Sequence, residues 1–443
     1  MPCDRHQSNH AARGWRSRLA VALLAALASW AGTGAGTLHA QEEMDAGEVA
    51  IGEVETRAAA VAPGVEIPAA AEVPDVETGT AAVAPGVETG AAAVAPSVEA
   101  QEVEAVEVQE TPAATPPISV GGGLQSSFLH HRSRDTDATD HLRVNSLRLY
   151  LNGAATDTIK FMVNTDIDYG GSLGAPNPGQ NTRFKILDAV AQFEMSDTFN
   201  VWVGRFLPPS DRANLYGPFY AHHWGVYADG VQDGYPFIFQ GRANGAAYWG
   251  QFDKVKVSAG AFDGHSTTGI SSLIGAGRVQ VNFWDPEPGY YLNSTYYGEK
   301  NILAIGLAGQ TQAESGNAYS ADFLMERKVA GGGAVSLEAE WARYDGLGGY
   351  DPRYVMNDGG YLLAAYLFPK RVGPGQFEIL GKYARARFRE GLTPDYNQKT
   401  TEVDLNYIIR QFNARLMIFF KDTSYTAVQT DDFQVGVGLQ IQM

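Results

Sequence analysis

The chain has 443 residues, a formal net charge of −17, 19% charged residues and a single cysteine, Cys3. The scarcity of cysteine excludes a disulfide framework and cysteine-based metal sites. No segment approaches about 18 consecutive apolar residues, which excludes a bundle of transmembrane helices. The 50 Gly and 21 Tyr instead favour many short strands with aromatic girdles, although a large soluble β-sandwich has a similar composition.

Residues 1–40 have the features of a secretory signal peptide. Three arginines precede an apolar run over 19–31, and the small residue Ala40 offers a cleavage point before Gln41. A membrane anchor is the alternative, but the run is shorter than the ~20 residues that span a bilayer. We therefore predict export to the cell envelope.

Residues 41–117 have a different composition, rich in Ala, Val, Glu and Pro, with sixteen acidic residues and one basic residue. An eleven-residue unit repeats four times over 56–99. Each repeat has a central proline, which costs a helix roughly 3 kcal/mol, so we predict a disordered or polyproline-like linker in the periplasm. A simple spacer is favoured over a tether to the cell wall or to a periplasmic partner. The prolines are Pro63, Pro74, Pro85 and Pro96.

From residue 118 onward, polar and apolar residues alternate with period two. Arg148 and Tyr150, for example, alternate with Leu147, Leu149 and Leu151. This pattern, repeated strand after strand, predicts an all-β fold for 118–443, a transmembrane antiparallel barrel with a polar lumen and an apolar outer face. The predicted strands begin near 118, 140, 157, 183, 198, 236, 253, 275, 300, 318, 333, 358, 374, 398, 412 and 431.

The sixteen predicted strands are joined by connections that alternate in length. Short turns are expected on the periplasmic side and longer loops outside. The longest predicted external loop is the third, 207–235, which is rich in aromatic residues and glycine. The connection 284–299 breaks the rule, because it is long where a short turn is expected.

Four stretches resemble the phosphate-selective porin O and P family. They are VWVGRF at 201–206 followed by two prolines, FWDPEPGYYLNSTYYGEKNILAIGLAGQ at 283–310, GGYLLAAYLFPK at 359–370 with FEILGKYARARF at 377–388, and EVDLNYIIRQFNARLMIFF at 402–420. The resemblance implies a sixteen-stranded outer-membrane barrel, commonly a homotrimer. It also implies passage of small anions through a constriction made by an inward-folded third loop, and it accounts for the long connection at 283–299.

The constriction would be set by the third loop and by charges on the lumen face. Arginine suits phosphate-like anions because its donors form a planar fork. Acidic residues nearly balance the basic ones over 118–443, so mutual pairing in a hydrated lumen is favoured over strict phosphate selectivity. The candidates are Arg212, His222 and His223 in the loop, with Arg148, Lys160, Arg242, Arg278 and Arg415 on strands.

Two other groups of residues have simpler interpretations. Neighbouring histidines on an extended chain point to opposite sides, so we predict that the His222–His223 pair anchors the loop, and we predict no metal site or other cofactor. Arg385, Arg387 and Arg389 share the parity of the lipid-facing residues. We expect them at the headgroup level, in contact with outer-membrane lipid and lipopolysaccharide.

The sequence thus predicts a porin of the bacterial outer membrane that lets small hydrophilic solutes or ions diffuse, with a weak anion or phosphate preference. A structural barrel that tethers the envelope or sheathes an electron-transfer partner is the alternative. No nucleophile–base motif stands out, so we predict no enzymatic activity. Nothing in the sequence points to nucleic acid as a partner.

Overall fold

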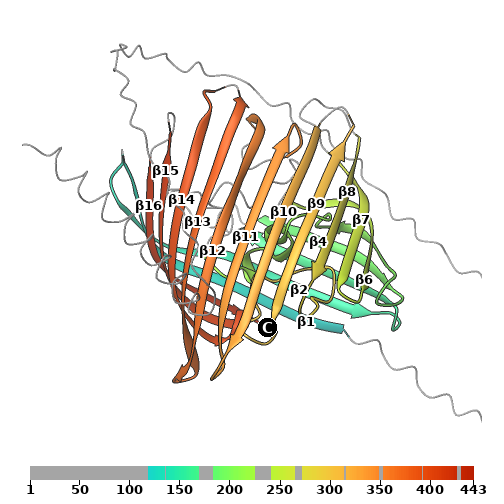
Figure 1. Cartoon of the computed structure of the whole chain (residues 1–443), viewed down its shortest axis with the longest axis horizontal. Helices are drawn as coiled ribbons and strands as arrows, with labels where there is room; N and C mark the ends of the chain where they lie inside the picture. Colours follow the sequence, from blue (N-terminus) through green and yellow to red (C-terminus); the bar gives the residue numbers. More distant parts are fainter. Residues whose placement is uncertain are drawn as a thin grey trace, which may run out of the picture. The chain divides into compact units, whose positions relative to one another are not determined.

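The computed structural model describes residues 118–134, 136–168, 183–224, 241–264, 272–313, 316–348, 353–391, 393–426 and 431–443. These residues contain sixteen β-strands (Figure 1). The strands are β1 (Ile118–Ser133), β2 (Thr139–Ala154), β3 (Ile159–Asp168), β4 (Arg183–Glu194), β5 (Asn200–Phe206), β6 (Ala243–Phe252), β7 (Val255–Asp263), β8 (Leu273–Asn282), β9 (Ile302–Gln312), β10 (Gly316–Val329), β11 (Gly333–Asp345), β12 (Tyr354–Val372), β13 (Gly375–Gly391), β14 (Tyr396–Arg410), β15 (Ala414–Tyr425) and β16 (Asp432–Gln442).

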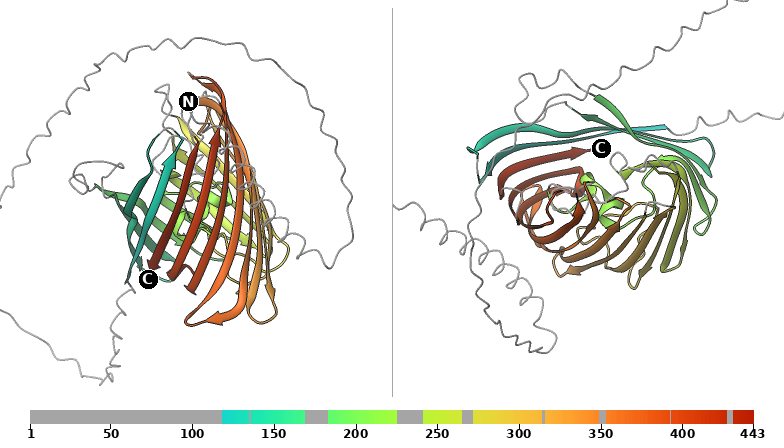
Figure 2. Two further views of the ribbon diagram at one scale, coloured as in Figure 1. Left: turned by 90° about the vertical axis from the view of Figure 1, so that its left-hand side faces the viewer. Right: turned by 90° about the horizontal axis from the view of Figure 1, so that it is seen from above.

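The strands form one closed antiparallel barrel in which each strand pairs with its neighbours in sequence. The first and last strands lie side by side and close the ring (Figure 2). Ser127 of β1 is opposite Gly438 of β16. Closure pairs the backbone groups of both edge strands, which an open sheet inside a bilayer would leave unsatisfied.

The inner and outer faces of the barrel wall have the reverse of the polarity found in a soluble β-protein. On β14, Glu402, Asp404 and Asn406 are buried inside the barrel, whereas Leu405 between them is 42% exposed on the outside. On β2, Arg148 is buried and its neighbour Leu149 is exposed. An apolar outer face around a polar interior is the arrangement of a transmembrane barrel and excludes the soluble sandwich. Within the described ranges, the helices are too short and too polar to cross a bilayer.

The predicted strand number, order and all-β class are confirmed, and most predicted strand starts lie within about three residues of the observed ones. The largest difference is β6, which begins at Ala243 rather than near 236. The predicted signal peptide 1–40, the predicted linker 41–117 and residues 225–235 of the third loop lie outside the described residues.

Candidate functional site

The connection between β5 and β6 folds into the barrel, and the structure describes its residues 207–224 and 241–242. It contains a short helix, α2 (Arg212–Tyr216), and a 3-10 turn, η1 (Pro218–Tyr220). The Asp211 side chain caps α2 by accepting a hydrogen bond from the Asn214 amide, 2.8 Å away. Gly217 ends the helix with φ 62°, a conformation that favours glycine. This segment is the third external loop predicted at 207–235, and its described part lies in the lumen.

Acidic side chains of the opposite wall hold this connection in place. The backbone amide of Ala213 donates to Glu340 on β11 over 3.1 Å, and the amide of Trp224 donates to Asp404 on β14 over 3.2 Å. The Tyr216 hydroxyl donates to Glu338, which also accepts from Tyr361 on β12. The acids on this part of the wall therefore serve as acceptors for the loop.

The connection between β8 and β9, residues 283–301, enters the lumen from the other end of the barrel. Glu326 on β10 organises it by accepting from the backbone amides of Tyr296 (2.8 Å) and Gly298 (2.7 Å) and from the hydroxyl of Thr295 (2.7 Å). This contact explains the unusual length of the connection, because a short turn could not reach the lumen.

The two connections meet at a buried ion pair. Both terminal guanidinium nitrogens of Arg212 donate to Glu287, over 2.9 and 2.6 Å, and both side chains are fully buried. Asp322 on β10 lies 3.6 Å from Arg212 and also binds Arg278 on β8. Burial alone would raise the pKa of Glu287, but the pairing with Arg212 outweighs it and lowers that pKa below its ordinary value.

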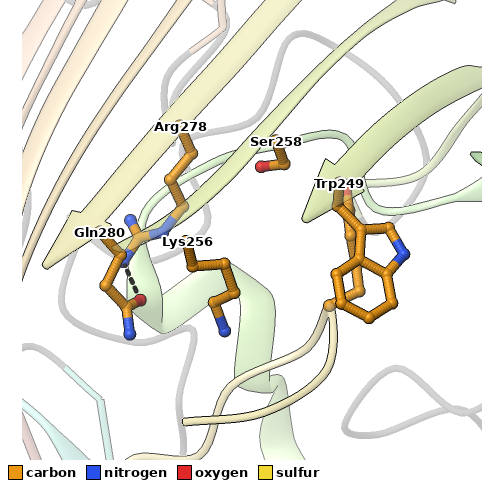
Figure 3. Close-up of a pocket in the computed structure, with 6 residues that line it drawn as sticks. Trp249, Lys256, Ser258, Arg278 and Gln280 are labelled. Atoms are coloured by element: carbon orange, nitrogen blue, oxygen red, sulfur yellow. Dashed lines mark hydrogen bonds between the residues drawn. The ribbon is translucent and has the colours of Figure 1, made fainter. Parts of the chain in front are cut away.

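Polar side chains of the neighbouring strands support this junction (Figure 3). Lys256 on β7 donates to the backbone carbonyls of Glu287 and Gly289, each over 3.0 Å. Arg278 donates to Gln280, and Trp249 lies across the remaining gap, whose volume is only about 10 Å³. This part of the lumen is therefore filled by protein.

A second set of contacts fixes the far end of the β5–β6 connection. His222 lies 2.8 Å from Glu378, and His223 lies 3.1 Å from the Lys382 ammonium, so the two histidines have different partners. Arg415 on β15 donates to the Ala221 carbonyl over 2.7 Å. Burial would lower the pKa of His222, but Glu378 outweighs it and raises that pKa, which favours a charged ring.

Open space remains on the other side of the lumen, between the two connections and the wall formed by β2, β3 and β4. This cavity of about 770 Å³ is lined by Arg148, Asn152, Asn164, Asp188 and Arg242, with Tyr220 and Tyr296 opposite. Arg242 pairs with Asp188 at 3.0 Å, and Arg148 lies a looser 3.9 Å from Asp166 and stacks over the Phe219 ring.

The eight predicted site residues therefore occupy three environments. Arg148 and Arg242 line the cavity. Lys160 does not line the cavity; its ammonium pairs with the Glu194 carboxylate at 2.8 Å. The other five are buried in the filled part of the lumen, where they bind strands or connections: Arg212, His222, His223, Arg278 and Arg415. Sequence reasoning missed Glu287 and Asp322, although the length of the connection that carries Glu287 was a usable signal.

Residues 118–221 match the family model described as phosphate-selective porin O and P. Similar solved structures include OmpF of Salmonella typhi in complex with daunomycin, with 12% identity, a TM-score of 0.51, and coverage of 74% of this chain and 97% of that one. OprB of Pseudomonas putida at high pH has 11% identity and a TM-score of 0.50 over 74% of this chain and 94% of that one. No curated protein sequence matches the chain. The chain thus has the fold of the porin barrels, and its residues 118–221 match the phosphate-selective porin O and P family.

Proposed function

We propose that the chain is a passive diffusion channel for small hydrophilic solutes and ions, and that they move along the cavity beside β2, β3 and β4. The observation that carries the proposal is the division of the lumen. The side facing β8 to β15 is filled by hydrogen-bonded side chains, while the cavity of about 770 Å³ lies on the opposite side. The family match favours a channel over an enzyme.

The proposed selectivity is a weak preference for anions, including phosphate. Arg148 and Arg242 place two guanidinium groups on the cavity wall. Asp188 and Asp166 oppose them, so the net field is small. Of these pairs, the Arg148–Asp166 contact is the looser one, at 3.9 Å, which leaves Arg148 the freer of the two to meet an anion.

We propose a homotrimer surrounded by outer-membrane lipid, with residues 1–40 as a signal peptide and 41–117 as a periplasmic linker. A structural barrel remains the second candidate function, because the filled half of the lumen would also suit a barrel that does not conduct.

Planar-bilayer recording of the purified full-length protein separates the two functions. A diffusion channel gives stepwise conductance, and its reversal potential in a potassium chloride gradient gives the ion preference. We expect open steps with a small anion preference. A folded, heat-modifiable barrel that inserts without conducting would contradict the channel and support the structural role.

A further inference from the structure

The outer surface of the barrel carries a cluster of basic side chains at the external ends of three strands. Arg385 and Arg387 on β13 point outward and are exposed, whereas Ala384, Ala386 and Phe388 between them are buried. β11, β12, β13 and β14 lie side by side in this part of the wall (Figure 1). The outer basic cluster consists of Arg343, Arg385, Arg387, Arg389 and Lys399.

Strand register brings two like charges of this cluster directly opposite each other. Arg385 of β13 is the partner position of Lys399 of β14. Like charges at paired positions destabilise a sheet unless an anion lies between them. Within the described residues, neither side chain has an acidic partner.

The acidic neighbours neutralise only the other members of the cluster. Asp358 on β12 binds both Arg387 and Arg389, and its side chain is only 6% exposed. Asp345 lies 3.5 Å from Arg343. In the hairpin beyond the cluster, the backbone amide of Glu390 donates to the Asp395 carboxylate, and among the described residues neither acid forms an ion pair with Arg385 or Lys399. The cluster therefore keeps a positive charge centred on the Arg385–Lys399 pair.

The residues beneath the cluster show its depth relative to the membrane. Tyr383 is exposed on the outer face of β13, and its partner position on β12 is the exposed Leu362. Tyr319 and Trp341 are exposed level with the cluster, opposite Arg343 and in the row of Arg385. Aromatic side chains of this kind mark the interface of an outer-membrane barrel. Tyr383 precedes Arg385 by two residues, which places the arginine about 7 Å further out. The cluster thus lies at headgroup level, above a surface suited to acyl chains.

We propose that the outer basic cluster binds the phosphate groups of an anionic lipid of the outer leaflet, with its acyl chains on the apolar and aromatic surface below. Arginine and lysine suit this ligand because phosphate accepts several charge-assisted hydrogen bonds at once. The apolar surface beneath favours a phosphate carried by a lipid over free phosphate. The inference rests on the outer-membrane location alone and does not depend on whether the barrel conducts.

Binding of purified bisphosphorylated lipid A to the detergent-solubilised full-length protein tests the proposal, with native mass spectrometry as the readout. We expect Arg385→Ala/Lys399→Ala to weaken binding at least about tenfold, the equivalent of roughly 1.4 kcal/mol. The control, Lys370→Ala/Arg371→Ala, removes two exposed basic residues at the opposite end of β12 and should bind as the unaltered protein does. Arg385→Lys/Lys399→Arg should restore binding.

Two further arms identify the ligand chemistry. Dephosphorylated lipid A should bind as weakly to the unaltered protein as lipid A binds to the double variant. Inorganic phosphate at millimolar concentration should not displace lipid A. Equal lipid A affinity of the double variant and the control would overturn the proposal, as would tight binding of inorganic phosphate alone. Bilayer conductance of the double variant should be unchanged, so the result is independent of the channel proposal.

Discussion

Replacement of Arg212 by alanine should widen the pore and make it noisy. Arg212 joins the β5–β6 connection to Glu287 of the β8–β9 connection and to Asp322 of β10, and its side chain is fully buried. Removing one partner of a buried pair costs about 3–5 kcal/mol, because the other charges stay buried without compensation. We expect both connections to loosen, with larger single-channel conductance and frequent fluctuations between levels.

A double-mutant cycle makes this prediction specific to the ion pair. Glu287→Gln should give a similar phenotype, and Arg212→Ala/Glu287→Gln should cost less than the sum of the two single changes. Arg343→Ala removes an exposed arginine from the outer surface and serves as the control. Conductance and noise that stay the same in Arg212→Ala and Arg343→Ala would show that the ion pair does not hold the lumen closed.

Reversing the two charges on the cavity wall should invert the ion preference. Arg148→Glu/Arg242→Glu changes the local charge by four units next to Asp166 and Asp188, in a narrow space where water screens poorly. The reversal potential in a salt gradient should change sign, from weakly anion-selective to cation-selective. Lys160→Glu alters a charge that pairs with Glu194 away from the cavity, and it should have a much smaller effect.

Equal reversal potentials in the double variant and in Lys160→Glu would remove Arg148 and Arg242 from the proposed route. A variant that no longer forms a heat-modifiable barrel would be replaced by Arg148→Gln/Arg242→Gln. These changes keep hydrogen-bonding capacity and should still abolish the anion preference.

The wall of the barrel could be predicted from sequence because each strand encodes its own orientation. The period-two alternation at Arg148, Leu149 and Tyr150 indicates which side chains face the lumen. This holds even when the partner strand is not known. The same alternation placed Arg385 and Arg387 on the outer face, where the structure has them. Chain order alone then fixed the topology, since every strand pairs with its neighbours in sequence.

The interior of the lumen could not be predicted in this way, because its contacts join residues that are far apart in sequence. Arg212 and Glu287 lie on different connections, and Ala213 and Trp224 bond to strands on the opposite wall. The alternation along each strand indicates that Arg278 and Arg415 face inward. It does not indicate whether the space in front of them is open or filled. That depends on two inward connections whose paths have no periodic signal.

Thiol modification of the open cavity tests the proposed route most directly, since Cys3 is the only native cysteine and can be replaced by serine. Asn152→Cys and Asn164→Cys place single thiols on the cavity wall, Ser336→Cys places one on the filled side, and Leu149→Cys places one on the outer face. A charged methanethiosulfonate reagent should lower single-channel conductance in discrete steps for the first two variants and leave the last two unchanged. Unaltered conductance in Asn152→Cys and Asn164→Cys after verified modification, or block through Ser336→Cys instead, would contradict the route along β2, β3 and β4.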